Sequence, residues 1–519
     1  MKTFKFIFLL IGVSLMGCSD LEEKPIGILA PDGFFQTTKD IQTAVEGAKT
    51  HAINEKFWGR KLSIALMLRS DMVNLQSDQT RRVEHDMLTT LTDNGMISEF
   101  WLKTYQGIAA ANLAIEGAAQ VDVADDLKNP IVAQAYFIRA FYYFHLVRQF
   151  GAIPYLDANV TDAEAGGSIG RTPAAEVYAN IIKDLEFAKT WLPPTQPSAG
   201  IPSKAAASSY LSLVYLTMAG TSDKAMFQKA YDEAVEVITT PEYGLDLDSN
   251  FQNLFNANVI DGSPEPIFAL DYNNVEASDN AYDQVAPMTG IRGDDRNSGG
   301  GWSVAVPTEA VYASFDQADY RTRVSFEEEA NIGGTFVTYE NFTISGHVHA
   351  RNTPYIAKYT RYPGPFARGS GRATSHNYSM IRFAEVLLIA AEAGVEIGQT
   401  GPALSYLNRV RTRARLGGAY KTGADVEMTF APSAVPADLT SITVTDVLEE
   451  RRIELAFEGK RWYDIARRRL GDAGNGDVFG AGGYEGAKPD FDENDYLMPL
   501  PGDELDRNPN LQPNNPGYN

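Results

Sequence analysis

The segment 449–469, EERRIELAFEGKRWYDIARRR, constrains the fold of this chain more than any other stretch. Placed on one helix over 446–470, it shows two apolar stripes on nearly opposite sides. Leu448, Leu455, Gly459, Trp462 and Ala466 form the first stripe, and Ile453 and Phe457 form the second. A helix at the protein surface carries a single apolar stripe. We therefore expect this helix to be packed on two sides, inside the fold.

A charged strip runs between the two stripes and consists of Glu450, Arg451, Glu454, Glu458 and Arg461. A buried charge needs a partner because an unpaired one is costly. The i,i+3 spacing predicts that Arg451 pairs with Glu454, and Glu458 with Arg461, within the helix. We interpret the strip as scaffold. The alternative, a set of catalytic carboxylates, would need a cleft that the pattern does not indicate.

Composition limits the classes of partner. The chain has 519 residues, of which 44% are hydrophobic, and a net charge of −22 with a pI of about 4.8. It is long enough to bury a large core. Nucleic-acid binding needs a basic face, so this charge argues against a nucleic-acid partner.

The N-terminus indicates export and lipidation. Lys2 and Lys5 precede an apolar run over 6–13 that is too short to span a bilayer, followed by Leu-Met-Gly-Cys ending at Cys18. This resembles the bacterial lipobox, in which the cysteine is acylated and the signal is cut before it. We predict a signal peptide over 1–17, a lipidated tether over 18–36, and a membrane anchor at Cys18. The acidic residues just after Cys18 resemble the signal that exports Bacteroidetes lipoproteins to the cell surface.

The rest of the chain, 37–519, reads as one mainly α-helical domain with three parts. Apolar residues recur at helical spacing over 37–240 and again over 380–519. Helix pairs with small residues at their contacts indicate a tetratricopeptide-like array. The part between them, 241–379, is rich in Gly, Asn, Asp and Pro and contains short β-like runs at 267–271, 335–343 and 355–359. Long loops on a rigid scaffold are where binding function tends to lie.

Five blocks, in this order, resemble the SusD/RagB family of surface glycan-binding lipoproteins. They are RAFYYFHLVRQFGAIPYL (139–156), MIRFAEVLLIAAEA (380–393), ALSYLNRVRTRARL (403–416), ERRIELAFEGKRWYDIARR (450–468) and LMPLPGDELDRNPNLQPNNPGY (497–518). The resemblance implies a SusD-like fold with four tetratricopeptide-like helix pairs plus a loop-rich region with short strands. It also implies a protein of the outer membrane that is not an enzyme. Such a protein captures an oligo- or polysaccharide and acts as a lid on a SusC-type TonB-dependent transporter.

The sugar contacts must be sought in this sequence. Aromatic rings cover the apolar faces of sugars, and polar side chains bond their hydroxyl groups. The best aromatic candidate is Trp302, which follows a Gly-rich loop, and Tyr282 is the second. The polar candidates are Arg292, Asp295, Arg296 and Asn297 beside Trp302, and Asp71, Asn74 and Arg81 in the loop after the second helix. If Arg81, Arg82, Arg292 and Arg296 converge, the ligand is a uronic-acid or sulfated glycan, since Arg binds anions in bidentate fashion. The alternative is that these arginines are solvated or form salt bridges of the scaffold.

Other functions stay open at this point. A peptide-binding member of the same family is the main alternative, and a glycoside hydrolase or a helical-repeat adaptor is a further one. The sequence predicts no metal site. Asp490, Asp492 and Asp495 resemble a calcium-binding pattern but lack the Gly and the terminal Glu of an EF-hand loop.

Overall fold

The computed structural model describes residues 31–518, with gaps at 77–79, 161, 163–165, 222, 273–281, 296–300, 342, 345–346, 349–352, 365–372, 481–487 and 489. The predicted signal peptide and Cys18 lie outside the described residues. Within those residues, no helix has both the length and the apolar character needed to cross a membrane. The division into three parts along the chain stays a prediction.

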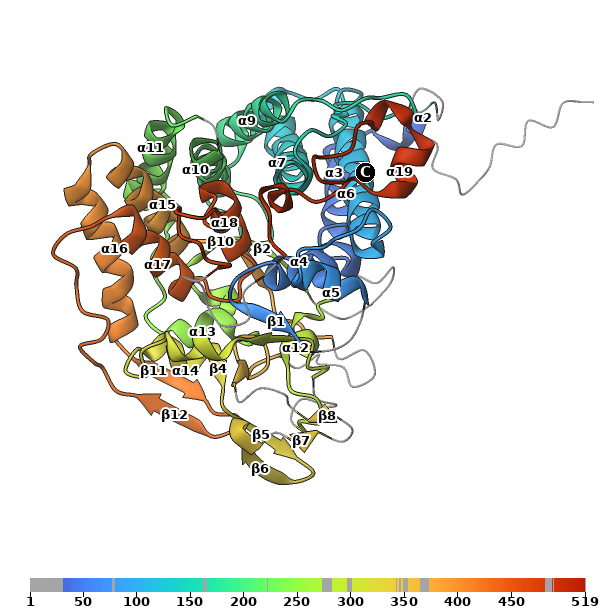
Figure 1. Ribbon diagram of the computed structural model, residues 1–519. Coiled ribbons are helices and arrows are strands. Elements are labelled where there is room, and N and C mark those ends of the chain that lie inside the picture. Colours follow the sequence, from blue (N-terminus) through green and yellow to red (C-terminus); the bar gives the residue numbers. More distant parts are fainter. Residues whose placement is uncertain are drawn as a thin grey trace, which may run out of the picture.

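The long helices follow one another in space as they do in sequence. In chain order they are α3 (Thr38–Thr50), α6 (Gly95–Ala118), α7 (Asp125–Phe150), α9 (Ala174–Trp191), α10 (Lys204–Thr221), α11 (Met226–Thr239), α15 (Phe383–Glu396) and α16 (Thr400–Arg415). Each packs on the next, and together they form an arc across the top of Figure 1. Taken two at a time they make four helix pairs, as the resemblance implied.

Helix α7 shows how the pattern produces this packing. Almost every side chain from Val132 to its end at Phe150 is buried, because α6 and α9 both lie against it. The helix ends at Gly151, which has φ of +67°, a conformation that glycine adopts without strain.

The loop-rich region contributes short antiparallel pairs and small helices. The strand pairs are β1 (Val73–Leu75) with β3 (Ala305–Pro307), β2 (Pro266–Leu270) with β10 (Tyr378–Arg382), β4 (Phe326–Glu327) with β9 (Tyr355–Ile356), β5 (Glu329–Ile332) with β6 (Thr335–Thr338), β7 (Thr343–Ile344) with β8 (His347–Val348), and β11 (Gly418–Lys421) with β12 (Glu427–Phe430). The three predicted β-like runs overlap β2, β6 and β9. The pairing of β1 with β3 joins segments more than two hundred residues apart.

Shorter helices connect these parts. They are α2 (Pro31–Phe34), α4 (Lys61–Leu68), α5 (Thr80–Asp86), α12 (Val285–Thr289), α13 (Glu309–Ala313), α14 (Tyr320–Ser325), α17 (Val444–Glu454), α18 (Arg461–Arg468) and α19 (Gly502–Arg507), with a π-turn, η1, at Glu55–Gly59. Short 3₁₀ turns lie at Pro241–Tyr243, Phe251–Phe255, Ile260–Gly262, Tyr339–Asn341, Glu493–Tyr496 and Pro509–Leu511.

The segment 446–470 is not one helix, and this part of the prediction was wrong. It breaks after α17 and resumes as α18. In the break, Phe457 and Gly459 take φ values of +63° and +69°, which continuous helix excludes. A Cβ on Gly459 would lie 3.0 Å from the ring of Trp58, so a distant contact holds the turn in place. Both halves are nevertheless buried, as the two stripes predicted.

The predicted ion pairs within this segment do not form either. Glu454 instead accepts hydrogen bonds from Arg321, Arg382 and Arg413, which come from three other segments. Burial alone would raise the pKa of Glu454, but the three guanidinium groups hold it well below its ordinary range. The charged strip is therefore the centre of a buried network that ties α17 to the loop-rich region and to α16.

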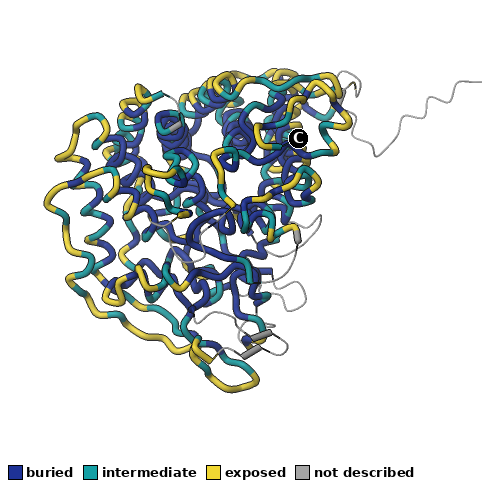
Figure 2. The backbone as a smooth tube through the Cα atoms, viewed as in Figure 1, coloured by how far each residue is buried: buried dark blue, intermediate teal, exposed yellow. Residues whose placement is uncertain are grey.

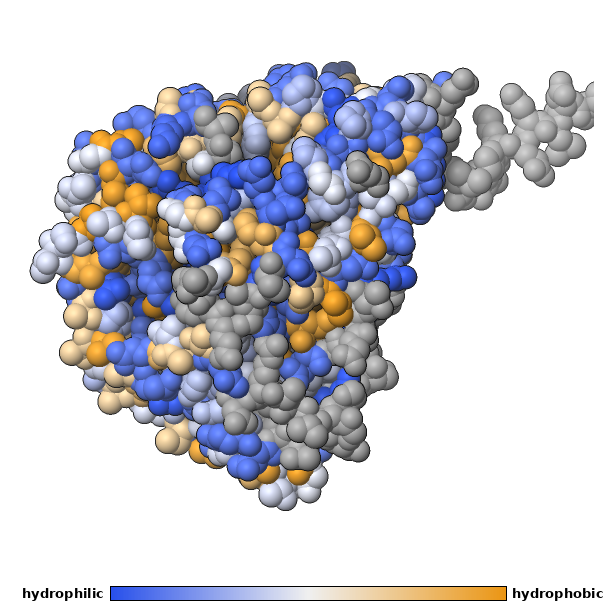
Figure 3. Space-filling model, in the orientation of Figure 1, coloured by the Kyte–Doolittle hydropathy of each residue, from blue (hydrophilic) through white to orange (hydrophobic). Residues whose placement is uncertain are grey.

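One core joins all parts of the molecule, and a single large apolar cluster includes residues from Ala48 to Leu511. Figure 2 shows buried backbone through the centre, with exposed segments along the outer helices and on the projecting β5–β6 and β11–β12 hairpins. In Figure 3, hydrophilic side chains cover most of the visible face and the hydrophobic ones form small separate patches.

Candidate functional site

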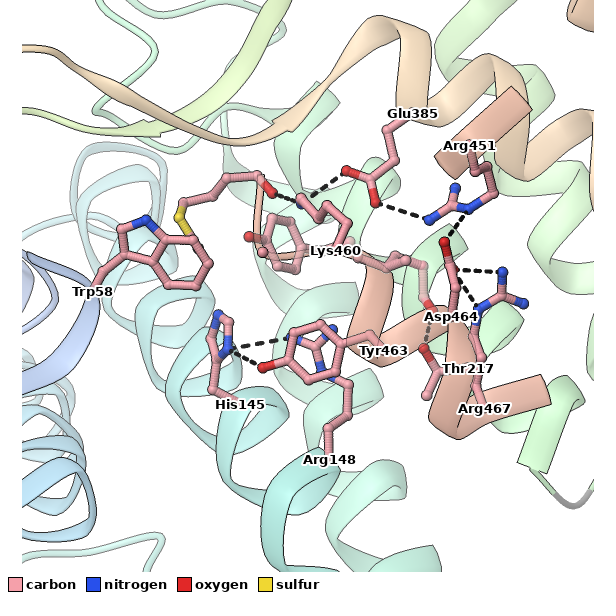
Figure 4. A pocket seen from close by; sticks show the side chains of 14 residues that line it. Trp58, His145, Arg148, Thr217, Glu385, Arg451, Lys460, Tyr463, Asp464 and Arg467 are labelled. Carbon is pink, nitrogen blue, oxygen red and sulfur yellow. Dashed lines mark hydrogen bonds and ion pairs between the residues drawn. The ribbon is translucent and has the colours of Figure 1, made fainter. Parts of the chain in front are cut away.

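A small internal cavity lies beside the 449–469 segment. It has a volume of about 20 Å³, enough for one water molecule. Figure 4 shows its lining, where Glu385 binds Lys460 and Arg451, and Asp464 binds Arg451 and Arg467. These are buried structural ion pairs. The cavity is too small for a sugar ring, so the segment serves the scaffold, as interpreted from the sequence.

A larger cleft opens on another face, where α4, α5, α6 and α12 meet. Its volume is about 380 Å³, within the range of small-molecule sites. The residues that line it are Arg60, Lys61, Ile64, Arg81, Arg82, Met96 and Met288. Four of these seven side chains are cationic, although the chain as a whole is strongly acidic. We call this the α4–α5 cleft.

The beginnings of three helices form this cleft. Lys61 is the first residue of α4, Arg81 and Arg82 follow the first residue of α5, and Met96 lies in the first turn of α6. A Cβ on Gly95 would lie 2.8 Å from Arg81 Cζ, so this guanidinium packs on the start of α6. The pairing of β1 with β3 brings α12 and its Met288 to the same place.

The contacts of three of the cations are as follows. Arg60 pairs with Glu55, and Lys61 Nζ lies 2.7 Å from Glu99. Arg82 contacts the sulfur of Met288 at 3.8 Å. Burial and the neighbouring charge of Arg60 lower the pKa of Arg82 to about 10. None of the described residues that line this cleft is acidic, and the charge of Arg60 acts against the charged form of Arg82.

Tyr282 lies at the edge of this group. Its carbonyl oxygen is so close above Gly59 that a Cβ there would lie only 2.3 Å away. Burial and the carboxylate of Glu55 raise the pKa of Tyr282. The loop-rich region thus reaches the residue next to Arg60, and Gly59 is needed for this approach.

Trp302 and its neighbours lie along the loop that follows α12. The backbone N–H of Trp302 donates to the carbonyl of Pro287 at 2.6 Å, and the indole ring is partly buried against the core. Arg292 donates to the Trp302 carbonyl at 3.3 Å. Asp295 accepts from the Gly334 N–H at 2.9 Å and so contacts the β5–β6 hairpin. Arg296 and Asn297 lie outside the described residues, so the convergence of all four arginines stays a prediction.

Asp71 and Asn74 are buried, with 4% and 5% of their surface exposed. Both carboxylate oxygens of Asp71 accept from Arg461, at 2.9 and 2.7 Å. Asn74 accepts from Lys488 at 3.4 Å. In this structure both residues hold β1 to the scaffold. Their role as sugar contacts stays a prediction.

Three cations of the cleft were absent from the sequence-based site: Arg60, Lys61 and Arg82, the last weighed only as part of an arginine cluster. Each lies in or just before the first turn of a helix that has no acidic residue in that turn. This feature could not have found them, because α10, α11 and α16 also have no acid in the first turn.

A second groove, of about 860 Å³, lies between the 194–203 loop and the 257–271 segment. Its charged residues are Asp261 and Asp271. Asp261 accepts from the Asn377 amide at 2.8 Å, and Asp271 from the Ser198 hydroxyl at 3.0 Å.

Among the described residues, no group of three His, Cys, Asp or Glu side chains is placed to hold a metal ion. Asp492 and Asp495, considered above for calcium, cap the 3₁₀ turn at Glu493–Tyr496 through backbone N–H groups. The structure gives these carboxylates a local role in the turn.

Comparison with known proteins connects this architecture to a family. The model described as "SusD family" matches residues 345–518, and the one described as "Starch-binding associating with outer membrane" matches residues 31–216. SusD-like protein P2 of Formosa agariphila is 48% identical over the whole of both chains.

Solved structures show the same fold. A SusD homologue from Bacteroides thetaiotaomicron superposes with a TM-score of 0.78 at 18% identity, covering 94% of this chain and 98% of its own. Surface glycan-binding protein A from the same organism, in complex with laminarihexaose, gives 0.72 at 20% identity, covering 92% and 99%. The likeness over the entire length of both chains to SusD-like protein P2 decides the assignment: the chain belongs to the SusD/RagB family, whose members are binding proteins and not enzymes.

Proposed function

We propose that this protein captures oligo- or polysaccharides at the cell surface and delivers them to a SusC-type TonB-dependent transporter. The observation that carries the proposal is the meeting of the loop-rich region with the α4–α5 cleft. Tyr282 reaches Gly59, and α12 supplies Met288 to the cleft wall. A site assembled from distant segments, with aromatic and polar side chains near a cleft of about 380 Å³, suits a ligand that has both apolar faces and hydroxyl groups.

The family relationship supports the glycan as ligand class. Among the proteins with the same fold, one is described as a laminarin-binding SusD-like protein and another was solved with laminarihexaose. Those ligands are known for those proteins alone, and the loops of this chain decide which glycan it binds.

The lid role rests on linkage. A ligand held between lid and transporter favours the closed state only as far as it binds that state better. An acyl anchor at Cys18 keeps the lid at high effective concentration beside its transporter. Co-purification from outer membranes tests this role: the wild-type protein brings down a large transporter, and Cys18→Ala moves the protein to the soluble fraction.

Trp302→Ala tests the glycan site. The full-length protein, purified in detergent, is screened on a glycan array and an oligopeptide array, and the best ligand is measured by calorimetry. We expect the variant to lose about 2 kcal/mol or more of binding free energy, as for a central aromatic contact. Trp191→Ala, in α9 and far along the helical arc, is the matched control.

Unchanged affinity in Trp302→Ala removes this residue from the site. Binding to peptides with no binding to any glycan replaces the proposed function with the peptide alternative.

A further inference from the structure

The charges of the α4–α5 cleft carry a conclusion about the class of glycan. Arg60, Lys61, Arg81 and Arg82 face one space of about 380 Å³. Among the described residues that line this space, none is acidic. The imbalance arises in a chain with 67 acidic and 45 basic residues, so it does not follow from composition.

The backbone adds to the positive potential. Helix N-termini carry partial positive charge, and cations there are unfavourable. At this cleft α4, α5 and α6 all begin, and none has an acid in its first turn. Lys61, Arg81 and Arg82 therefore lie where a helix disfavours them. An arrangement that opposes local stability in this way is typical of functional sites.

Two details indicate that the cleft suits an anion. The Nε of Arg60 is buried with no hydrogen-bond acceptor in the structure, and such a donor is costly to leave unsatisfied. The pKa of Arg82 falls to about 10 because of burial and the charge of Arg60. A bound anion would accept a hydrogen bond from Arg60 Nε and would reduce the electrostatic repulsion between Arg60 and Arg82.

We propose that the α4–α5 cleft binds the negatively charged groups of an acidic glycan, either uronic-acid carboxylates or sulfate esters. This inference rests on the proposed function and narrows it to a substrate class. Arg60, Arg81 and Arg82 supply planar guanidinium groups, which match both anions in bidentate geometry. Lys61 adds a point charge.

Calorimetry on the full-length protein in detergent tests the proposal, with four probes. Alginate oligosaccharides carry carboxylates, κ-carrageenan oligosaccharides carry sulfates, and laminarin and starch oligosaccharides are neutral. We expect binding to at least one acidic probe, with affinity falling as NaCl is raised, and weaker or no binding to the neutral ones. The acidic probe that binds distinguishes carboxylate from sulfate.

The double variant Arg81→Gln/Arg82→Gln is expected to weaken acidic-glycan binding by about tenfold or more, the effect of losing charge-assisted hydrogen bonds. Lys183→Gln/Lys224→Gln changes net charge equally at exposed positions in and near α9 and α11, and is expected to leave binding unchanged. A thermal melt of each variant confirms that the fold is retained.

The outcomes separate this inference from the proposed function. Binding of a neutral glycan, insensitive to salt and to Arg81→Gln/Arg82→Gln, overturns the acidic class and leaves glycan capture intact. Binding of acidic probes that the double variant does not weaken removes the cleft from the site. Failure to bind any of the four probes or any glycan on the array overturns both.

Discussion

The 449–469 segment and the α4–α5 cleft are both rich in arginine, and they differ in how those charges are balanced. Around Glu454, each fully buried arginine bonds to carboxylates supplied by other segments. At the cleft, four cations line one space, and no described residue of the lining is acidic. The first arrangement satisfies its own charges and holds the fold together. The cleft presents a positive potential to an open space, and such a potential attracts an anionic partner.

Removing the central carboxylate of the network should have the largest effect. Glu454→Gln leaves Arg321, Arg382 and Arg413 buried with one negative charge fewer, and breaking such a network costs about 3–5 kcal/mol. We expect guanidinium chloride unfolding to show a loss of this size, or a protein that does not accumulate. Arg321 comes from the loop-rich region, and Arg382 and Arg413 come from β10 and α16 after it, so the damage should reach beyond α17.

The control is an ion pair in which both side chains are exposed. Glu493→Gln removes an acid whose side chain is 76% exposed and pairs with Arg469, itself 43% exposed, and such a pair contributes about 0–1 kcal/mol. Equal losses in the two variants would contradict the distinction between buried network and surface pair.

Acid should weaken the scaffold in two stages. The buried histidines His85 and His376 have pKa values lowered by burial to about 3 and about 4, and burial also lowers the pKa of His145 well below its ordinary range. The unfolded chain takes up protons below pH 6.5 while the folded one does not, so stability falls as pH drops from 6.5. We expect about 1–2 kcal/mol per histidine by pH 5.

Below pH 4.5 a second loss begins. The arginines hold the pKa of Glu454 and Asp464 below the ordinary range despite burial, so the folded state resists protons that the unfolded state accepts. Burial of Asp283 raises its pKa to about 6, so this group opposes the trend between pH 6 and 3.8. Burial also raises the pKa of Asp184, Glu233, Asp271 and Asp495, which act in the same direction. Urea unfolding at pH 7, 6, 5 and 4 measures the balance; a stability that is flat down to pH 5 would contradict the histidine assignment.

Local sequence signals predicted the helical arc and much of its detail. The apolar spacing of α7 and its stop at Gly151 were readable because they depend on neighbours within a few turns. The break at Gly459 was not, because it is held by Trp58, four hundred residues earlier in the chain. The partners of Glu454 were missed for the same reason: i,i+3 spacing identifies a local option, and the fold offered arginines from three other segments.

The predicted site shows the same limit. Polar residues in a loop suggested ligand contact for Asp71, and its structural partner Arg461 is 390 positions away. Arg81 lies at the cleft as an exposed cation, and Tyr282 lies next to Arg60, so part of the predicted set does gather. No rule applied to the sequence indicated that Arg60 and Lys61 would join them, since that requires three helices to begin at one place.

The smallest effect expected is also the sharpest test of the contrast. Arg81→Glu replaces a cation in the first turn of α5 with an acid, which the helix dipole favours by about 0.3–1 kcal/mol. The free protein should therefore become slightly more stable in a thermal melt, while binding of an acidic glycan weakens.

In the scaffold the same exchange, Arg382→Glu, would place a fourth acid beside Glu265, Glu454 and Glu458 and unfold the protein. Lys183→Glu, in the interior of α9, controls for net charge and should shift stability by less than about 0.5 kcal/mol. A drop in stability for Arg81→Glu would mean that Arg81 holds the fold, and the cleft would then belong with the buried network.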